Sequence, residues 1–344
     1  MPVLQIIYGL PVSLSAIPRL STIARQLGPG TISVFADHPD HIRALEKVDA
    51  AAWPGKIPVW VNIDVGDHRE GVPATSQQLA DIARVSADSQ RTSVVGIYTH
   101  LGSSYASSSP EDALEYMAQE LQGLEQGALA FKDVKKGDSK FGLSLGATPT
   151  ATSLQTLLDD SAGAKKYRDM IEKLKASYDV EYHAGVGPVN DMQQLATRAR
   201  KQDLLSFRDL GFRVLAEVAS VYPDRGDKPE ALIAAGSIVL GREPCKSYPG
   251  WGVVTPWPAS KGQHYDPEGS KTGWIVGRIS QEHGVLTYEG STDGMRQLAH
   301  GEKVLIWPNH ACIAGVNFAF YLVVDSENED PEKVVDVWVR WRGW

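Results

Sequence analysis

Cysteine is scarce in this chain. Cys245 and Cys312 are the only two cysteines among 344 residues, too few for a framework of disulfides. Small secreted proteins often need such a framework, whereas intracellular proteins keep their thiols reduced. The cysteine content therefore favours a reducing compartment, and we expect a cytoplasmic protein.

An excess of basic residues is also lacking. The chain has 34 Lys and Arg against 42 Asp and Glu, which gives a formal net charge of −8. Surfaces that bind nucleic acids or anionic membranes are usually basic, because they neutralise phosphate groups. The charge balance argues against both kinds of partner. A small anionic ligand would have to be bound by local donors.

Charged residues are absent from the first 18 positions, which could be mistaken for a signal or membrane segment. The segment has no basic start, contains Gly9 and Pro11, and is short for a membrane span. The run from Leu4 to Leu10 has the length of a parallel strand that is buried on both faces. We therefore expect a buried strand here and no membrane segment.

Short apolar runs alternate with helix-like stretches over the first 200 residues. The apolar runs are 4–10, 32–36, 58–63, 94–98, 143–145 and 180–182, and the helix-like stretches include 16–27, 76–86, 110–123 and 164–178. This alternation predicts parallel strands joined by crossover helices. Six units end near Arg200, whereas a closed (β/α)8 barrel has eight. We predict an α/β domain over residues 1–205, an incomplete barrel of about six units.

The second part of the chain, residues 206–344, has a different pattern. Long apolar or alternating runs at 212–222, 231–240, 272–288, 303–324 and 334–341 are separated by Gly and Pro turns. Such runs are typical of β-strands joined by turns. We predict a mainly β C-terminal domain.

Polar residues gather where four of the predicted strands end. The clusters are Asp64–Val72, Tyr98–Tyr105, Ser144–Thr150 and Glu181–Gly187. Active sites of parallel α/β sheets lie at the carboxyl ends of the strands. The third cluster runs into a helix predicted at Ala151–Leu158, which can offer N–H and hydroxyl donors to a phosphate. Turn glycines, a helix cap or a hydrogen-bonded histidine could explain each cluster alone, but four together favour one site.

The run Trp307–Cys312 contains a candidate metal motif. If the segment is extended, as its apolar flanks suggest, His310 and Cys312 project from the same face. An imidazole with a thiolate suits zinc, and two protein ligands leave positions open for water and substrate. The alternative is a buried histidine beside a buried free cysteine, since free cysteines often act as small apolar residues. The spacing alone leaves both explanations open.

Seven segments of the chain together resemble a known family. They are GIYTHLGSSY, SLGATPT, EYHAG, FRVLAEVASVYPDR, ISQEHG, PNHAC and VVDVWVRWRGW. In this order they are similar to the eukaryotic D-serine dehydratase and D-threonine aldolase family, most of all to its fungal dehydratase-like members, over essentially the whole chain. The resemblance implies an alanine-racemase-type barrel that binds pyridoxal phosphate and a C-terminal β-domain with a metal site. It is also compatible with a homodimer.

The resemblance assigns roles to residues at the strand ends. The implied cofactor-binding residues are Arg69, His100, Tyr105, Gly146, Thr148, His183, Gly185 and Val186. His100 and Tyr105 would lie against the ring and the substrate, and they are the catalytic candidates. Arg69 would approach the ring oxygen of pyridoxal. Gly146, Thr148 and the backbone around Gly185 would hold the phosphate.

The same resemblance implies a reaction on a small D-amino acid. His310 and Cys312 would hold zinc, which would bind the β-hydroxyl and make it a better leaving group. A lysine joined to the cofactor would remove the α-proton, so that elimination gives a keto acid and ammonia. In an aldolase the Cα–Cβ bond would break instead; Cys312 favours the dehydratase. His283 is a candidate for a residue that contacts the metal ligands without binding the metal itself.

One element that the resemblance implies is lacking. Family members carry the Schiff-base lysine at the end of the first barrel strand, in a Thr-His-Lys-Thr type motif, and this sequence has no such motif. Met1 aligns with what looks like the third barrel strand, in agreement with the count of six units. Lesser departures are Asp67, where an aromatic residue is usual, and Val186–Gly187, where Asn-Tyr is usual.

Three explanations of the lacking lysine compete. The protein could be a lyase whose N-terminus is missing from this sequence, a pseudoenzyme that keeps metal or phosphate binding, or a zinc-dependent enzyme that works without the Schiff base. We favour the first, and we expect residues 1–344 alone to be unstable and to lack D-serine dehydratase activity, because a Schiff-base catalyst needs an amine at the cofactor carbon.

Overall fold

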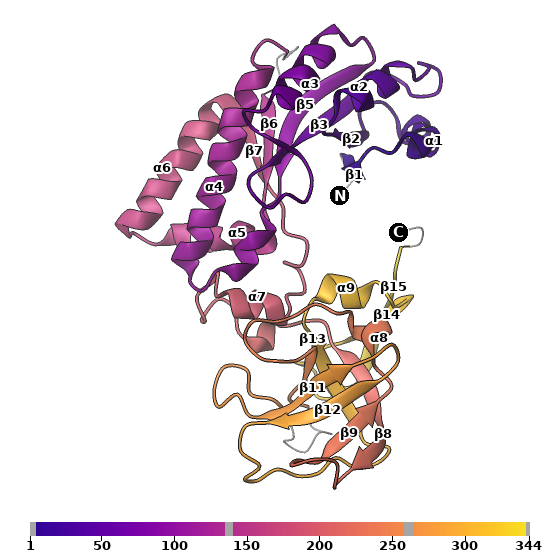
Figure 1. Ribbon diagram of the computed structural model, residues 1–344, viewed down its shortest axis with the longest axis vertical. Helices are drawn as coiled ribbons and strands as arrows, with labels where there is room; N and C mark the ends of the chain where they lie inside the picture. The colour runs from indigo at the N-terminus through magenta and orange to yellow at the C-terminus, as the bar shows by residue number, and fades with distance from the viewer. Residues whose placement is uncertain (1–4, 135–139, 258–263, 342–344) are drawn as a thin grey trace. The chain divides into compact units, whose positions relative to one another are not determined.

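The computed structural model describes residues 5–134, 140–257 and 264–341. The chain divides into two compact units (Figure 1). The first comprises Met1–Ala184 with Thr197–Lys201, and the second comprises Gly185–Ala196 with Gln202–Trp344. Each unit is described by itself below.

The first unit is built on a sheet of parallel strands. The strands are β1 (Ile6–Pro11), β2 (Ile32–Ala36), β3 (Ile57–Asp64), β5 (Thr92–Thr99), β6 (Phe141–Leu145) and β7 (Tyr178–Tyr182), and they lie side by side in sequence order. Every neighbouring pair is parallel, and the short β4 (Val72–Pro73) pairs with β3 alone. This confirms the predicted α/β class and the six successive units (Figure 1).

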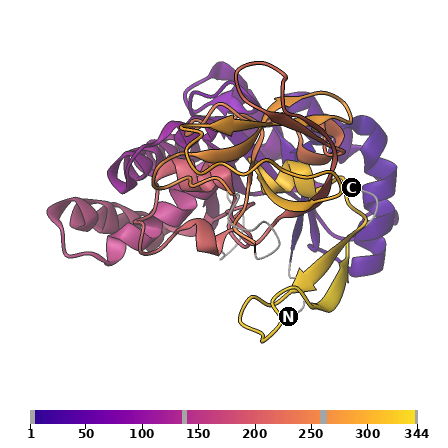
Figure 2. The ribbon, with the colours of Figure 1, turned by 90° about the horizontal axis from the view of Figure 1, so that it is seen from below.

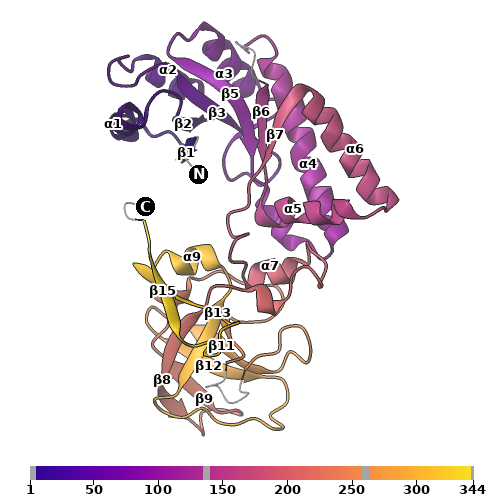
Figure 3. The same ribbon diagram turned by 180° about the vertical axis from the view of Figure 1, so that it is seen from behind.

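Helices connect the strands. They are η1 (Leu14–Ala16), α1 (Ile17–Leu27), α2 (Pro39–Glu46), α3 (Gln77–Asp88), η2 (Gly102–Ala106), α4 (Pro110–Ala128), η3 (Leu129–Phe131), α5 (Thr148–Ser153), η4 (Leu154–Leu158) and α6 (Ala162–Ser177). Serine hydroxyls begin the three long ones: Ser76, Ser109 and Ser161 each accept a backbone N–H of the first turn, which satisfies a donor that has no partner within the helix. Helices α4 and α6 pack against each other (Figure 3).

The two faces of the sheet have different roles. In β3, Val59, Val61 and Ile63 belong to the main hydrophobic cluster, which includes buried residues of α3 and α4. Because side chains alternate along a strand, Trp60 points to the opposite face. There a Cβ on Gly96 would lie 2.4 Å from the Trp60 ring, and one on Gly142 would lie 2.5 Å from it. Both glycines are therefore required by the packing of this tryptophan.

Strand β1 is not buried, contrary to the prediction for Leu4–Leu10. Ile6 is 43% exposed and Leu10 is 67% exposed. Within the described residues β1 pairs with β2 alone, so one side of the strand has no neighbour. An apolar run predicts a buried strand only if other strands or helices cover it, and the sequence of the run does not contain that information.

The second unit contains a closed barrel of antiparallel strands in the order β10 (Gly252–Val254), β11 (Gly273–Ile279), β12 (Gly284–Glu289), β9 (Glu230–Ile233), β8 (Val214–Tyr222) and β13 (Lys303–Pro308). Its core includes Val218, Trp274 and Leu286. Strands β14 (Phe320–Val324) and β15 (Val334–Val339) form a separate two-stranded sheet, yellow in Figure 2. The short helices are α7 (Met192–Thr197), η5 (Phe207–Asp209), α8 (Ser237–Leu240) and α9 (Ala311–Gly315). This confirms the mainly β second part.

None of the helices in the described ranges is long and apolar enough to cross a membrane.

Candidate functional site

An open cleft lies at the carboxyl ends of β3 and β5 in the first unit. Its lining residues are Asn62, Ile63, Asp64, Asp67, Arg69, Glu70, Tyr98, Thr99 and His100. The cleft therefore brings together two of the four polar clusters predicted from the sequence. It lies at the edge of the sheet where parallel α/β proteins bind their ligands.

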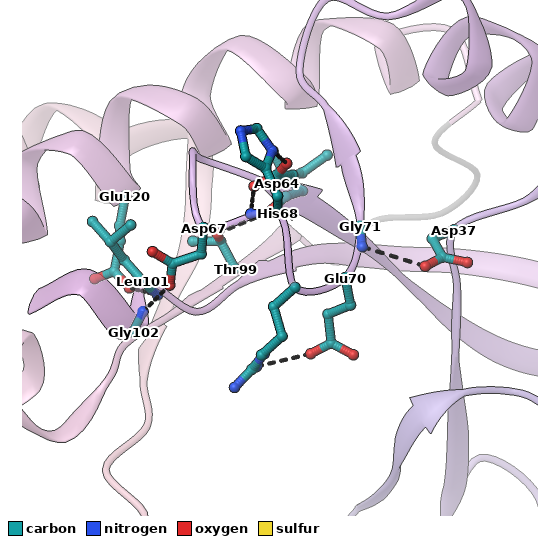
Figure 4. Close-up of polar contacts among 12 residues, drawn as sticks. Asp37, Asp64, Asp67, His68, Glu70, Gly71, Thr99, Leu101, Gly102 and Glu120 are labelled. Atoms are coloured by element: carbon teal, nitrogen blue, oxygen red, sulfur yellow. Dashed lines mark hydrogen bonds and ion pairs between the residues drawn. The ribbon is translucent and has the colours of Figure 1, made fainter. Parts of the chain in front are cut away.

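The turn after β3 presents Arg69 to this cleft. Asp64 accepts the N–H groups of Gly66 and His68 through Oδ1, at 2.9 and 3.1 Å, and its Oδ2 lies 2.7 Å from Nδ1 of His68 (Figure 4). Burial alone would raise the pKa of Asp64, but these donors outweigh it and lower the pKa below its usual value. Arg69 follows directly and donates to Glu70 at 2.9 Å.

Asp67 connects this turn to the loop after β5. Its carboxylate accepts the backbone N–H of Gly102 and, at 3.1 Å, that of Ser103 (Figure 4). These are the first two residues of η2, which carries Tyr105. Asp67 thus holds the start of η2 through its backbone.

Two histidines and a tyrosine form a stack beside the cleft. The rings of Tyr98 and His183 are 4.4 Å apart and nearly parallel, and His100 lies 6.3 Å from His183. Burial lowers the pKa of each histidine to about 4, and the charge of Arg69 acts in the same direction. Both rings are therefore neutral at neutral pH, and they can stack or accept a hydrogen bond without carrying charge.

The tautomer of His183 follows from its neighbours. The Ser144 hydroxyl donates to Glu181 at 2.8 Å, and its oxygen lies 3.2 Å from Nδ1 of His183. A hydroxyl has one hydrogen, so Nδ1 of His183 must carry its own hydrogen and donate it to Ser144. The other nitrogen, Nε2, is then an acceptor. It is buried and makes no hydrogen bond of normal geometry with the described residues, while the Gly146 backbone beside the ring opposes the fall in the pKa of His183.

A buried acid, Glu120, lies behind the loop after β5. The side chain comes from α4, is 0% exposed, and accepts the N–H of Leu101 at 3.0 Å (Figure 4). Its second oxygen makes no hydrogen bond of normal geometry with the described residues, although Thr150 and the Gly146 backbone lie near the carboxyl and act to lower its pKa. Burial raises the pKa of Glu120 to about 8. Sequence reasoning missed this residue, because a lone Glu in an amphipathic helix is usually exposed.

The turn after β6 is more closed than predicted. The helix begins at Thr148, not at Ala151, and Thr148 is 2% exposed. Gly146 has φ +140°, and a Cβ there would lie 2.3 Å from the carbonyl oxygen of His183, so only glycine fits. The N–H of Ala147 already donates to the Thr150 hydroxyl at 2.9 Å.

The structure gathers some of the predicted cofactor residues and not others. Arg69 and His100 line the cleft, and His183 stacks beside them. Tyr105 is half-buried in η2 and is not among the nine lining residues. Gly185 and Val186 belong to the second unit.

The candidate metal motif is not extended, contrary to the prediction. Strand β13 ends at Pro308, His310 is the N-cap of α9, and Cys312 lies in its first turn. The N–H of Ala314 donates to the carbonyl of His310 at 3.1 Å, as in a helix. The reason for the error is that a short apolar run after a strand is compatible with a further strand or with a helical turn.

His310 nevertheless has a defined environment. Its Nδ1 lies 2.6 Å from Oε1 of Gln193, and Cys312 is an exposed free thiol. His283 is exposed in the turn between β11 and β12, and its role stays a prediction. The described residues contain no cluster of three His, Cys, Asp or Glu side chains that could hold a metal.

Comparisons with known proteins agree with this architecture. Residues 13–160 match the family model of the alanine racemase N-terminal domain, and residues 211–324 match a putative serine dehydratase domain. The structure of a D-threo-3-hydroxyaspartate dehydratase from a Delftia species has the same fold, with a TM-score of 0.73 at 23% identity over 98% of this chain and 79% of that one.

Two fungal proteins are more similar in sequence. The D-serine dehydratase of Schizosaccharomyces pombe is 32% identical over 349 residues, which cover 99% of this chain and 74% of that protein. The D-serine dehydratase of Saccharomyces cerevisiae is 32% identical over 99% of this chain and 75% of its own length. With the alanine-racemase-like fold and the strand-end cleft, these similarities show that the chain belongs to the D-serine dehydratase family of lyases.

Proposed function

We propose that this protein eliminates water from a D-hydroxy amino acid, D-serine in the first instance, to give a keto acid and ammonia. Membership of the family and the cleft at the ends of β3 and β5 support the proposal. The main observation in its favour is that Arg69 and the neutral histidine His100 line the same cleft.

The residues around the cleft fit the ring of pyridoxal phosphate. When bound, this cofactor supplies an electron sink for the charge at the substrate α-carbon. Arg69 brings a cation to the cleft, where it would approach the ring oxygen. The buried acceptor Nε2 of His183 and the buried side-chain amide of Asn62 make no hydrogen bond of normal geometry within the described ranges. Unpaired polar atoms of this kind are expected in a site that binds a polar ligand.

The proposed phosphate-binding residues, in the turn after β6, are more buried than most of the residues that line the cleft. Gly146 and Thr148 of the first unit would hold the phosphate. Gly146 fits this role, because its lack of a side chain allows a close approach of the backbone. The N–H of Ala147 donates to Thr150, so a phosphate would have to compete with that hydroxyl or use other donors.

The donor set of His310 and Cys312 fits zinc. One nitrogen and one sulfur are ligands that zinc accepts, and two protein ligands leave positions open. A zinc ion supplies Lewis acidity to a hydroxyl that it binds. One solved structure of a D-threo-3-hydroxyaspartate dehydratase is that of a cysteine-to-alanine mutant in the metal-free form.

The other residues would position the substrate. Asp67 fixes the start of η2 and thereby Tyr105, the catalytic candidate of this loop. His100 is neutral because burial lowers its pKa, so it can accept a hydrogen bond at neutral pH without carrying charge. No lysine is among the nine residues that line the cleft. We therefore expect residues 1–344 alone to bind the cofactor without a covalent bond. The protein is further proposed to be cytoplasmic and homodimeric.

The test of the function compares substrates. The 5′ end of the transcript is sequenced first, so that the protein assayed is the one encoded. With pyridoxal phosphate and zinc it is expected to release keto acid from D-serine and not from L-serine, and Arg69→Ala should weaken cofactor binding. Glycine and an aldehyde from D-threonine would instead indicate an aldolase. Cofactor binding without either product would indicate a pseudoenzyme.

For residues 1–344 alone, borohydride reduction should fix no cofactor onto the chain. A lysine labelled by this treatment, together with turnover of D-serine, would show that the chain contains the nucleophile and that we have missed it. That result would support the proposed reaction, but it would contradict the expectation that residues 1–344 bind the cofactor without a covalent bond.

A further inference from the structure

We propose that Gln193 is a positioning residue for the metal ligand His310. Its side-chain oxygen holds the imidazole in the tautomer that carries hydrogen on Nδ1, which assigns Nε2 as the metal-binding nitrogen. This inference rests on the zinc site proposed above. It concerns residues of the second unit alone.

The orientation of the Gln193 amide is fixed by its second contact. The Nε2 group of Gln193 donates to the carbonyl of Pro244 at 2.8 Å. A carbonyl oxygen can only accept, so the amide nitrogen must face Pro244 and the amide oxygen must face His310. The oxygen lies 2.6 Å from Nδ1 of His310. Nδ1 must therefore be the donor, which leaves Nε2 as the nitrogen that can bind a metal.

Backbone contacts hold Gln193 in place. Its N–H donates to the carbonyl of Asn309 at 3.1 Å, the residue before the metal ligand. Asn309 is itself buried and donates to the carbonyls of Glu243 and Gly250, at 2.8 Å each. The two hydrogen bonds of the Gln193 side chain are therefore made from a rigid base.

A neighbouring acid, Asp191, holds the backbone that follows His310. Asp191 accepts the N–H of Ala311 at 2.9 Å, and its other oxygen accepts the N–H of Gln194 at 2.9 Å. Residues 191 and 193 thus contact 309, 310 and 311 in turn. These contacts agree with the place of the segment Gly185–Ala196, which follows β7, in the second unit.

An acceptor behind a metal-binding histidine has a known physical effect. It fixes the ring orientation and tautomer and makes the free nitrogen more basic, and its loss typically weakens metal affinity about 10- to 100-fold. The side-chain oxygen of Gln193 supplies such an acceptor before any metal is bound. We infer that the site is preorganised for a metal through Nε2 of His310.

The experiment measures zinc affinity by competition with a chelator. Gln193→Met removes the acceptor but keeps the length of the side chain, and it is expected to weaken binding about 10- to 100-fold. Gln193→Glu retains an oxygen acceptor and should restore most of the affinity. Thermal unfolding of the metal-free variants checks that the fold is kept. Nitrogen NMR of the metal-free protein should find hydrogen on Nδ1 of His310, and a tautomer mixture in Gln193→Met.

Failure of this inference and failure of the zinc site give different results. If the unsubstituted protein binds zinc and Gln193→Met binds it equally well with the same His310 tautomer, Gln193 does not position the ligand. If the unsubstituted protein binds no zinc, or His310→Ala/Cys312→Ala binds it equally well, the proposed metal site is wrong and the inference falls with it.

Discussion

The open sheet of the first unit and the closed barrel of the second place their polar residues differently. In the sheet, Asn62 and Ser144 lie within strands and are buried, on the face opposite the main hydrophobic cluster. In the barrel, the core is apolar, and Asn309 and His310 follow the end of β13. Closing a small barrel uses its interior for packing, whereas an open sheet leaves a face for chemistry.

This difference changes how each site controls its histidines. In the first unit, burial keeps His100 and His183 neutral by lowering the pKa of both. In the second unit, His310 is oriented by a hydrogen bond to Gln193. We infer that solvent exclusion is the main control at the strand ends, and geometry is the main control at the metal motif. The predictions below test that contrast.

The largest expected effect is the loss of zinc from the second unit. His310→Ala/Cys312→Ala should lose about one zinc per chain, because both proposed ligands are removed. Metal analysis of purified protein measures it. Cys245→Ala is the matched control: Cys245 is buried, with its sulfur 3.5 Å from the carbonyl of Met192, and this variant should keep its zinc. Equal zinc in the double variant and the parent would refute the site.

In the first unit, Gly146→Ala should lower the free energy of unfolding by about 1–3 kcal/mol or more. The new Cβ would lie 2.3 Å from the His183 carbonyl oxygen, in a backbone conformation that favours glycine. Urea unfolding measures the change. Gly163→Ala is the control, since no atom lies within 4 Å of its added Cβ and alanine suits its helix. Equal stabilities of the two variants would mean that the turn after β6 can relax.

The sequence predicted those features that depend on local pattern. Residues 32–36 form β2 as expected, because a run with four apolar residues in five between turn signals specifies a strand. β1 was predicted as a strand but not as an exposed one, since its burial depends on neighbours. The α9 turn was missed for the same reason: its first N–H is bound by Asp191, 120 positions earlier. Gln193 and Glu120 gain their roles from distant contacts, which no local pattern shows.

The pH dependence of stability should reveal the buried histidines. The pKa of each is about 4 in the folded protein, down from 6.5. Between these values the unfolded chain binds protons that the folded chain does not, so stability should rise with pH from about 4 to 6.5. His100→Gln/His183→Gln should flatten this rise in urea unfolding. An unchanged slope would show that water reaches the rings and that burial does not control them.

Glu120 should make stability change with pH in the opposite direction and over a higher pH range. One proton is involved, against two for the pair of histidines. Its pKa is about 8 when folded and 4.5 otherwise, so the folded chain keeps a proton that the unfolded chain loses. Stability should therefore fall with pH through this range, by about 1.4 kcal/mol per pH unit for one proton. Each unfolded histidine still binds half a proton at pH 6.5 and little above about pH 7.5, so the two histidines oppose the Glu120 slope below that value and the slope of Glu120 dominates above it.

Glu120→Gln should remove this slope while keeping an oxygen that accepts the Leu101 N–H. The measurement is urea unfolding of both proteins at pH 6.5, 7.2 and 8, with Glu115→Gln as a control on an exposed face of the same helix. Asp67 is the nearby acid, and its charge also favours a protonated Glu120; Asp67→Asn should therefore reduce the slope only in part. If Glu120→Gln and the parent lose stability equally with pH, the carboxyl is ionised and paired in the folded protein, and hydrogen bonding controls both units alike.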